Sequence, residues 1–298
     1  MVVEATCQSN SVTEAVIAGM AAMGGMPART ALYQLPAFRP VALKFLKMLA
    51  NEEAEVQKIA ALLRSDPALG AEVLTVANSA GYGHSHHVDN LVQAIMVLGF
   101  EKTKSLTLTI ALKSFLGDFG NAKVMKACWR HSLATALVAE QLAELYGVSM
   151  DQAYTAGLMH DVGRLGLLMI DGERYAPALE RRHRSVGDCL EAERGLFHMD
   201  HCQAGLWMTQ KWGFPTEFSR VAGCHHEELA GRPRDLASLA CAACLLADAL
   251  GYAAVTCEQA PSAAEIAMQL PASPWNRYNF REAELGDYVA KQIALVDV

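Results

Sequence analysis

Apolar residues at helical spacing, interrupted by glycine and proline, run through most of the 298-residue chain. Pro40 starts one such segment, and Ser65-Asp66-Pro67 combines a helix-capping residue with proline at the first helical position. Gly99 and Gly251 end further segments. The alternation typical of strands is confined to short stretches such as residues 106–110, which lie within a helical pattern. The sequence therefore predicts an all-α fold.

Composition limits the partners and the location of the chain. Hydrophobic residues make up 52% of the sequence, which is enough for a sizeable core. The formal net charge is −7 and no basic run occurs, so a nucleic acid polymer is not expected as a partner, because phosphate contacts need a basic surface. Residues 15–26 are apolar but lack the preceding positive charge of a secretory signal, and no uncharged apolar run reaches the roughly 18 residues of a membrane span.

The eight cysteines do not show the spacing of a disulfide framework, so we expect reduced thiols and a cytoplasmic location. The one Cys-x-x-Cys, Cys241-Ala-Ala-Cys244, lies in the apolar run 236–250. A structural zinc site of this kind needs a second pair of ligands. The pattern therefore favours two core cysteines one helical turn apart.

The stretch Ala156-Gly-Leu-Met-His-Asp-Val-Gly-Arg-Leu-Gly166 places two types of metal ligand, His160 and Asp161, on adjacent residues. Neighbouring side chains on a helix point about 100° apart, so both can face one buried point only where a helix ends. The pattern fits either a ligand pair at a helix end or an ordinary polar cap.

Further candidate ligands lie in or beside helical segments rich in small apolar residues: His131, His201, His225, His226 and Asp248. His225 and His226 are predicted to form a doublet on one helix. A carboxylate in the apolar run 236–250 is costly to bury unless it is paired or binds a metal, although it could also lie at the solvent edge of its helix. Imidazoles and carboxylates on successive helices could hold two divalent ions about 3.5–4 Å apart, an arrangement that serves in-line displacement at phosphorus.

Other histidines and a charged segment are weaker candidates. His198 lies three residues before His201 and could replace it as a ligand. The run His84-Ser-His-His87 could capture metal but is more typical of a polar loop. Residues 175–194 are strongly charged and predict a solvated helix.

The spacing of the histidines and aspartates resembles the HD superfamily of metal-dependent phosphohydrolases, and four motifs resemble its HDOD branch over about residues 30–255. These motifs are Leu35-Pro36, Ser65-Asp66-Pro-Ala-Leu69, Ala77-Asn-Ser-Ala-Gly-Tyr-Gly83 and Ala94-Ile-Met-Val-Leu-Gly99. The resemblance implies a helical bundle packed on an HD-type helical subdomain, in a bacterial signalling or regulatory protein. Many HDOD members have lost metal ligands and resemble non-catalytic modules, whereas this sequence keeps the ligand set.

The chain is also similar to the HD-GYP cyclic-dinucleotide phosphodiesterases. That resemblance implies one metal ion held by His131, His160 and Asp248, a second held by His201, His225 and His226, and Asp161 as the bridge. Arg164 stands where that family has a lysine that contacts the substrate phosphate, and arginine keeps the charge but not the shape. The Gly-Tyr-Pro signature is absent, and His225-His-Glu-Glu-Leu-Ala-Gly-Arg-Pro233 stands in its place.

Together these features predict an N-terminal arm (1–30), an N-terminal helical subdomain (31–120), an HD-like metal-binding subdomain (121–255) and a C-terminal helical extension (256–298). The predicted function is a signal-transduction module with an intact dinuclear metal site and weak or no catalysis. The alternative is an active phosphohydrolase on a nucleotide or cyclic dinucleotide, with Asp161 and Arg164 as catalytic residues. The expected ions are iron or manganese, with zinc or nickel possible, and the expected partner is a signalling protein or a nucleotide.

Overall fold

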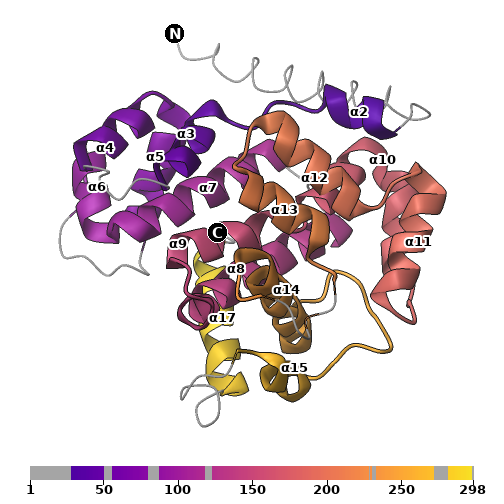
Figure 1. The fold of residues 1–298 in the computed structure, drawn as a ribbon. Helices are drawn as coiled ribbons and strands as arrows, with labels where there is room; N and C mark the ends of the chain where they lie inside the picture. Colours follow the sequence, from indigo (N-terminus) through magenta and orange to yellow (C-terminus); the bar gives the residue numbers. More distant parts are fainter. Residues whose placement is uncertain are drawn as a thin grey trace.

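The computed structural model describes residues 28–49, 56–79, 87–117, 123–227, 229, 233–271 and 281–296 (Figure 1). Most of the predicted arm lies outside these ranges, as do His84 and His86. The helices are α2 (Ala28–Gln34), α3 (Pro40–Leu49), α4 (Val56–Arg64), α5 (Pro67–Ala77), α6 (Leu91–Leu98), α7 (Phe100–Leu116), α8 (Lys123–Tyr146), α9 (Met150–Met159), α10 (Val162–Glu180), α11 (Val186–Phe197), α12 (His201–Trp212), α13 (Thr216–Cys224), α14 (Leu236–Ala247), a π-helical turn (Asp248–Tyr252), α15 (Ala263–Gln269) and α17 (Glu282–Val296). Within the described ranges every regular element is helical, apart from one isolated bridge between His183 and Cys257, which confirms the all-α prediction.

Local capping signals start the helices where the sequence predicts them. α3 begins at Pro40, and α5 begins directly after Asp66, whose carboxylate accepts a hydrogen bond from the main-chain N of Leu69 at 3.2 Å. Arg39 pairs with the same carboxylate at 2.9 Å and donates to Ser114 Oγ of α7 at 2.6 Å. The cap of α5 is thereby fastened to α7.

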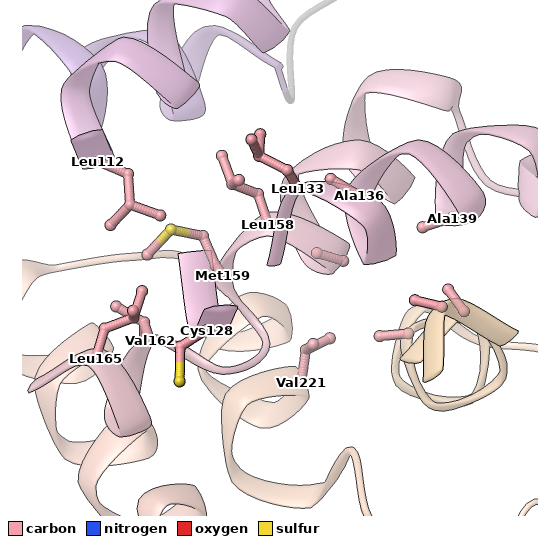
Figure 2. Packing of buried hydrophobic residues seen from close by; sticks show 14 of the residues in the cluster. Leu112, Cys128, Leu133, Ala136, Ala139, Leu158, Met159, Val162, Leu165 and Val221 are labelled. Atoms are coloured by element: carbon pink, nitrogen blue, oxygen red, sulfur yellow. The ribbon is translucent and has the colours of Figure 1, made fainter. Parts of the chain in front are cut away.

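Buried apolar side chains form two cores. One is made by α3 to α7 and includes Ile59 and Ile95. The other is made by α2, α7 and the helices from α8 onward, and Figure 2 shows part of it around Leu158, Met159 and Val162. In Figure 1, α3 to α6 form one group and α7 extends from them toward α8 and α9. The boundaries of the four predicted parts stay predictions.

Two glycines around His160-Asp161 allow unusually close helix packing. A Cβ at Gly157 would lie 2.6 Å from Ala136 Cα, so α9 contacts the backbone of α8. A Cβ at Gly163 would overlap the backbone of His201 and Gly205, so the start of α10 contacts α12. Since real Cβ atoms do not approach backbone this closely, only glycine fits at both positions. The two contacts bring the histidines of α8 and α12 to the His160-Asp161 junction.

A buried ion pair joins α7 to α9. Lys104 Nζ lies 3.1 Å from Asp151 Oδ2, and the two side chains are only 9% and 5% exposed. We expect Asp151→Asn to lower the free energy of unfolding by about 1–3 kcal/mol, because it removes the buried counter-charge of Lys104 and leaves only the partly exposed carboxylate of Glu101, 3.4 Å away. Urea denaturation measures this loss. Asp287→Asn, at an exposed position on α17, is the control and should unfold as the wild type does; equal values for the two variants would contradict the prediction.

Candidate metal centre

The His160-Asp161 pair lies at the junction of two helices. His160 follows the last residue of α9, and Asp161 precedes the first residue of α10, with φ −105° and ψ 17°. Both side chains are buried, and the carboxylate of Asp161 makes no capping hydrogen bond. The helix end turns both side chains inward, so the carboxylate does not act as an ordinary cap.

His131, from the middle of α8, faces His160. Their Nε2 atoms are 3.1 Å apart. The Nδ1 atom of His160 lies 2.6 Å from Gly157 O, and that of His131 lies 3.1 Å from Tyr252 O and 3.2 Å from Asp248 Oδ1. These oxygens only accept hydrogen bonds, so each Nδ1 carries the proton and, in the neutral rings, the two Nε2 lone pairs face one another. A cation between the two Nε2 atoms would remove the repulsion between these lone pairs.

His201, the first residue of α12, forms a second group with His225 and His226. Its Nε2 atom lies 3.0 Å from His226 Nε2, while its Nδ1 atom lies 2.7 Å from Glu193 Oε2. The two neighbouring histidines lie in the turn after α13 and not on a helix, contrary to the sequence-based expectation of a helical doublet. The helix end is what turns adjacent imidazoles toward the same place.

Asp161 lies between the two groups. Its Oδ1 atom is 3.4 Å from His201 Nε2 and 3.8 Å from His225 Nε2, and one of its oxygens falls within 4.8 Å of a His160 ring nitrogen. Both ring nitrogens of His225 and the Oδ1 atom of Asp161 are buried and make no hydrogen bond, whereas Asp161 Oδ2 pairs with Arg164. Buried polar atoms without partners cost free energy unless a metal ion binds them. These residues therefore fit a transition-metal site.

Electrostatics keep three of the donors in the forms that bind a metal. Burial lowers the pKa of His160 to about 3 and holds the pKa of His225 well below its usual range. Burial disfavours the charged form of Asp161, but the Arg164 guanidinium and the surrounding imidazoles hold the pKa of this carboxyl well below its usual range. Neutral imidazole and ionised carboxylate are the ligand forms.

The imidazoles of His131 and His201 each face a carboxylate and differ in charge from the other rings. Burial opposes the charging of both, but Asp248 raises the pKa of His131 and Glu193 raises the pKa of His201 to about 10. A metal ion therefore has to displace a proton from each of these two rings.

Arg164 lies inside the cluster. Its side chain is 5% exposed, with Nη1 3.0 Å from Asp161 Oδ2 and Nη2 3.2 Å from His201 Nε2. Arg164, His131, His226 and Asp248 help to line a cavity of about 20 Å³, which has room for about one water molecule. The guanidinium is thus occupied by the candidate ligands themselves.

The structure brings all seven predicted ligands together, although Asp248 takes a different place from the other six. Its carboxylate faces Nδ1 of His131, on the opposite side of the ring from His160. Its side chain is 27% exposed. His198, the predicted substitute ligand, is exposed and ends α11 in the left-handed region with φ 57°.

The sequence analysis missed Glu193. The predicted solvated helix over 175–194 is wrong: it contains the end of α10 and most of α11, and Glu193 is 1% exposed. Cys189 and Phe197, one turn away on either side, are buried too. The i, i+4, i+8 spacing of these three residues was the available signal for a buried face among the charges.

The sequence analysis also missed the orientation of Cys244. Both Cys241 and Cys244 are buried, as the core reading predicts, but their thiols differ in partner. Cys241 Sγ donates to Glu227 O at 3.3 Å, whereas Cys244 Sγ lies 3.6 Å from His131 Nε2. Two cysteines on adjacent turns of α14 thus contact different groups, a main-chain carbonyl for Cys241 and the His131 imidazole for Cys244.

In the part of the chain that the structure describes, no helix has both the length and the apolar character to cross a bilayer.

Known proteins are similar to this chain, one in sequence and two in fold. An uncharacterised protein of Treponema pallidum (strain Nichols) is 24% identical over 200 residues, which are 62% of this chain and 36% of that protein, so the chain spans little more than a third of its length. A structure from Marinobacter aquaeolei, named "Putative signal transduction protein", has a TM-score of 0.71 and 19% identity, covering 96% of this chain and 66% of the other. One from Shewanella amazonensis, named "Putative metal-dependent phosphohydrolase", has a TM-score of 0.56 and 19% identity, covering 86% and 91%.

The HDOD domain model matches residues 35–228. This range holds the helices from α3 to α13 and, of the seven predicted ligands, all except Asp248. Since the match covers more than half of the chain, the protein belongs to the HDOD family.

Proposed function

We propose that this HDOD chain is a signal-transduction module that binds two divalent transition-metal ions and hydrolyses phosphodiesters weakly or not at all. The family, and the name of the Marinobacter aquaeolei neighbour, support a signalling role. The buried imidazole of His225, which makes no hydrogen bond, and the Asp161 carboxylate beside it support metal binding. The module would respond to a signalling protein or a nucleotide.

The proposed ligands divide between two ions. His131 and His160 would hold one ion, His201, His225 and His226 the other, and Asp161 lies where it can reach both. When bound, such a pair of ions supplies an activated water and neutralises phosphate charge. The ions expected from the sequence are iron or manganese. Zinc or nickel would also accept imidazole donors.

The burial of Arg164 is the observation that favours a regulatory module over an enzyme. A residue that clamps a substrate phosphate has to present its charge to an open site. Here the guanidinium contacts Asp161 and His201, and the adjoining cavity measures about 20 Å³. Pockets for small molecules are typically about 300–1,000 Å³, so a nucleotide has no room at this centre.

The alternative is an active phosphohydrolase in which the site opens to a nucleotide or cyclic dinucleotide. The full donor set, and the name of the Shewanella amazonensis neighbour, favour it. In that case Arg164 would turn from Asp161 to the substrate phosphate.

Metal content and hydrolysis, measured on the same preparations, test the proposal. We expect about two transition-metal ions per chain in protein purified without chelator or histidine tag, loss of both in Asp161→Ala, and full retention in Asp89→Ala, which alters an exposed carboxylate. With manganese or iron restored, a panel of nucleotides and cyclic dinucleotides should show no useful turnover. Turnover that disappears in Asp161→Ala would establish the enzyme instead, and metal-free wild-type protein would refute the metal site.

A further inference from the structure

We propose that Cys244 supplies a thiolate to the ion held by His131 and His160, so that this half of the cluster is a two-histidine, one-cysteine centre selective for zinc over manganese. The inference rests on the metal site proposed above and concerns its third ligand. Asp248 then becomes a positioning residue for His131 and not a ligand.

The distances fit a tetrahedral zinc ion. For Zn–N bonds of about 2.0–2.1 Å and a Zn–S bond of about 2.3 Å, tetrahedral angles place two nitrogens about 3.3 Å apart and nitrogen and sulfur about 3.5 Å apart. His131 Nε2 lies 3.1 Å from His160 Nε2 and 3.6 Å from Cys244 Sγ. All three donor atoms fall within 4.8 Å of one another.

The hydrogen bonds of the two histidines leave the metal-facing side open for a third donor. Both Nδ1 atoms are committed to backbone or carboxylate oxygens, as is usual for metal-binding imidazoles. Both Nε2 atoms therefore point at the space beside the thiol. Cys244 is 2% exposed and, with His131, helps to line the cavity of about 20 Å³ beside these nitrogens.

Cys244 and Asp248 both contact His131, and we assign them different roles, Cys244 as a metal ligand and Asp248 as a positioning residue. Cys244 and Asp248 are four residues apart, which places them on the same side of the helix. Cys244 reaches Nε2 of His131, and Asp248 reaches Nδ1 of the same ring at 3.2 Å. A carboxylate at Nδ1 fixes the orientation of the imidazole and raises its basicity.

Cys202 is the competing thiol, since its Sγ atom lies 3.6 Å from His201 Nε2. Apart from Asp161, which can reach both ions, the centre around His201 already has three imidazoles. The centre around His131 has only two imidazoles unless a further donor joins. The ligand count therefore favours Cys244.

A thiolate changes which metal is bound. Soft sulfur donors favour zinc, whereas manganese prefers oxygen. The sulfur–metal bond forms as the S–H proton leaves to solvent, with no change of oxidation state, so binding releases one proton per thiolate.

Cobalt(II) reports a thiolate ligand directly, because cobalt–thiolate bonds give an intense near-ultraviolet charge-transfer band that histidine and carboxylate ligands do not give. The full chain, stripped of metal, is titrated with Co²⁺. We expect the band in the wild type, in Cys241→Ser and in Asp248→Asn, and its loss in Cys244→Ser. Cys241→Ser is the matched control, since it alters the other buried thiol of the same helix. Zinc affinity should fall at least about tenfold in Cys244→Ser.

The other outcomes separate the two proposals. Cobalt binding without a charge-transfer band, or a band that survives in Cys244→Ser and vanishes in Cys202→Ser, overturns the role of Cys244 and leaves the metal site standing. Absence of cobalt binding in the wild type overturns both. If Cys244→Ser does not fold, as judged by circular dichroism, Cys244→Ala replaces it and is read in the same way.

Discussion

Gly163→Ala is expected to lower the free energy of unfolding by more than about 3 kcal/mol, at the upper end of what overpacking costs. A Cβ at this position would overlap the carbonyl of His201 and the backbone of Gly205. Side chains can change rotamer to relieve a clash, but backbone atoms of a packed helix cannot. The start of α10 would have to separate from α12. Equilibrium urea unfolding, followed by circular dichroism, measures the effect.

Gly172→Ala is the matched control, because it makes the same chemical change on the same helix. A Cβ at Gly172 would meet nothing within 4 Å. We expect this variant to unfold as the wild type does, or slightly later, since alanine restricts the unfolded chain more than glycine does. If Gly163→Ala were as stable as Gly172→Ala, the close contact of α10 with α12 would be wrong. The contact sets the 3.4 Å between Asp161 Oδ1 and His201 Nε2, so Gly163→Ala should also weaken metal binding.

The features that sequence predicted well are those that depend on neighbouring residues. The starts at Pro40 and after Asp66 follow from capping chemistry within a few residues, and both are confirmed. The segment that begins at Leu236 was expected to continue to residue 250, yet α14 ends at Ala247 and a π turn follows. The kink at Asp171 was not predicted either. Both irregularities lie within otherwise helical patterns, and local propensity does not encode them.

In the candidate site, too, some residues could be predicted from the sequence and others could not. The histidines and aspartates could be found because their types are unusual in apolar segments, and the structure brings them to one buried cluster. The spacing of Glu193 on α11 indicates a buried face, but its role could not be predicted, because its partner His201 follows only after the chain reverses at His198. Cys244 resembled a core residue because only the packing of α14 on α8 shows that it faces His131.

These two missed residues affect the chemistry in different ways. Glu193 holds Nδ1 of His201, as Asp248 holds Nδ1 of His131. The carboxylate of Glu193 is fully buried, whereas that of Asp248 is partly exposed. Each proposed ion thus has one imidazole whose orientation is fixed by a carboxylate, and a buried carboxylate fixes it more firmly.

Glu193→Ala is therefore expected to lower the free energy of unfolding of the metal-free protein by about 3–5 kcal/mol, the usual cost of removing one partner of a buried ion pair. The carboxylate accepts hydrogen bonds from the main-chain N of His201 at 2.8 Å, from its Nδ1 atom and from the Tyr175 hydroxyl, and all three would lose their partner. Glu191→Ala, an exposed position on the same helix, should change the value by less than about 0.5 kcal/mol. Urea unfolding in the presence of chelator compares the variants.

The pH dependence of this difference separates a charged Glu193 from a merely space-filling one. Burial raises the pKa of Glu193, but His201 and Arg164 outweigh it and hold the pKa at about 2, below the 4.5 of an ordinary glutamate. A carboxyl with a lowered pKa stabilises the fold above its unfolded value, and the contribution is lost as the pH falls toward the folded value. The gap in stability between wild type and Glu193→Ala should thus be full between about pH 4.5 and 6.5 and close as the pH falls toward 2. It should also narrow above pH 6.5, because the raised pKa of His201 stabilises the pair only while this imidazole is charged. A gap that stays constant over this range would mean that the side chain stabilises α11 by packing alone, and that it does not hold His201 in place by its charge.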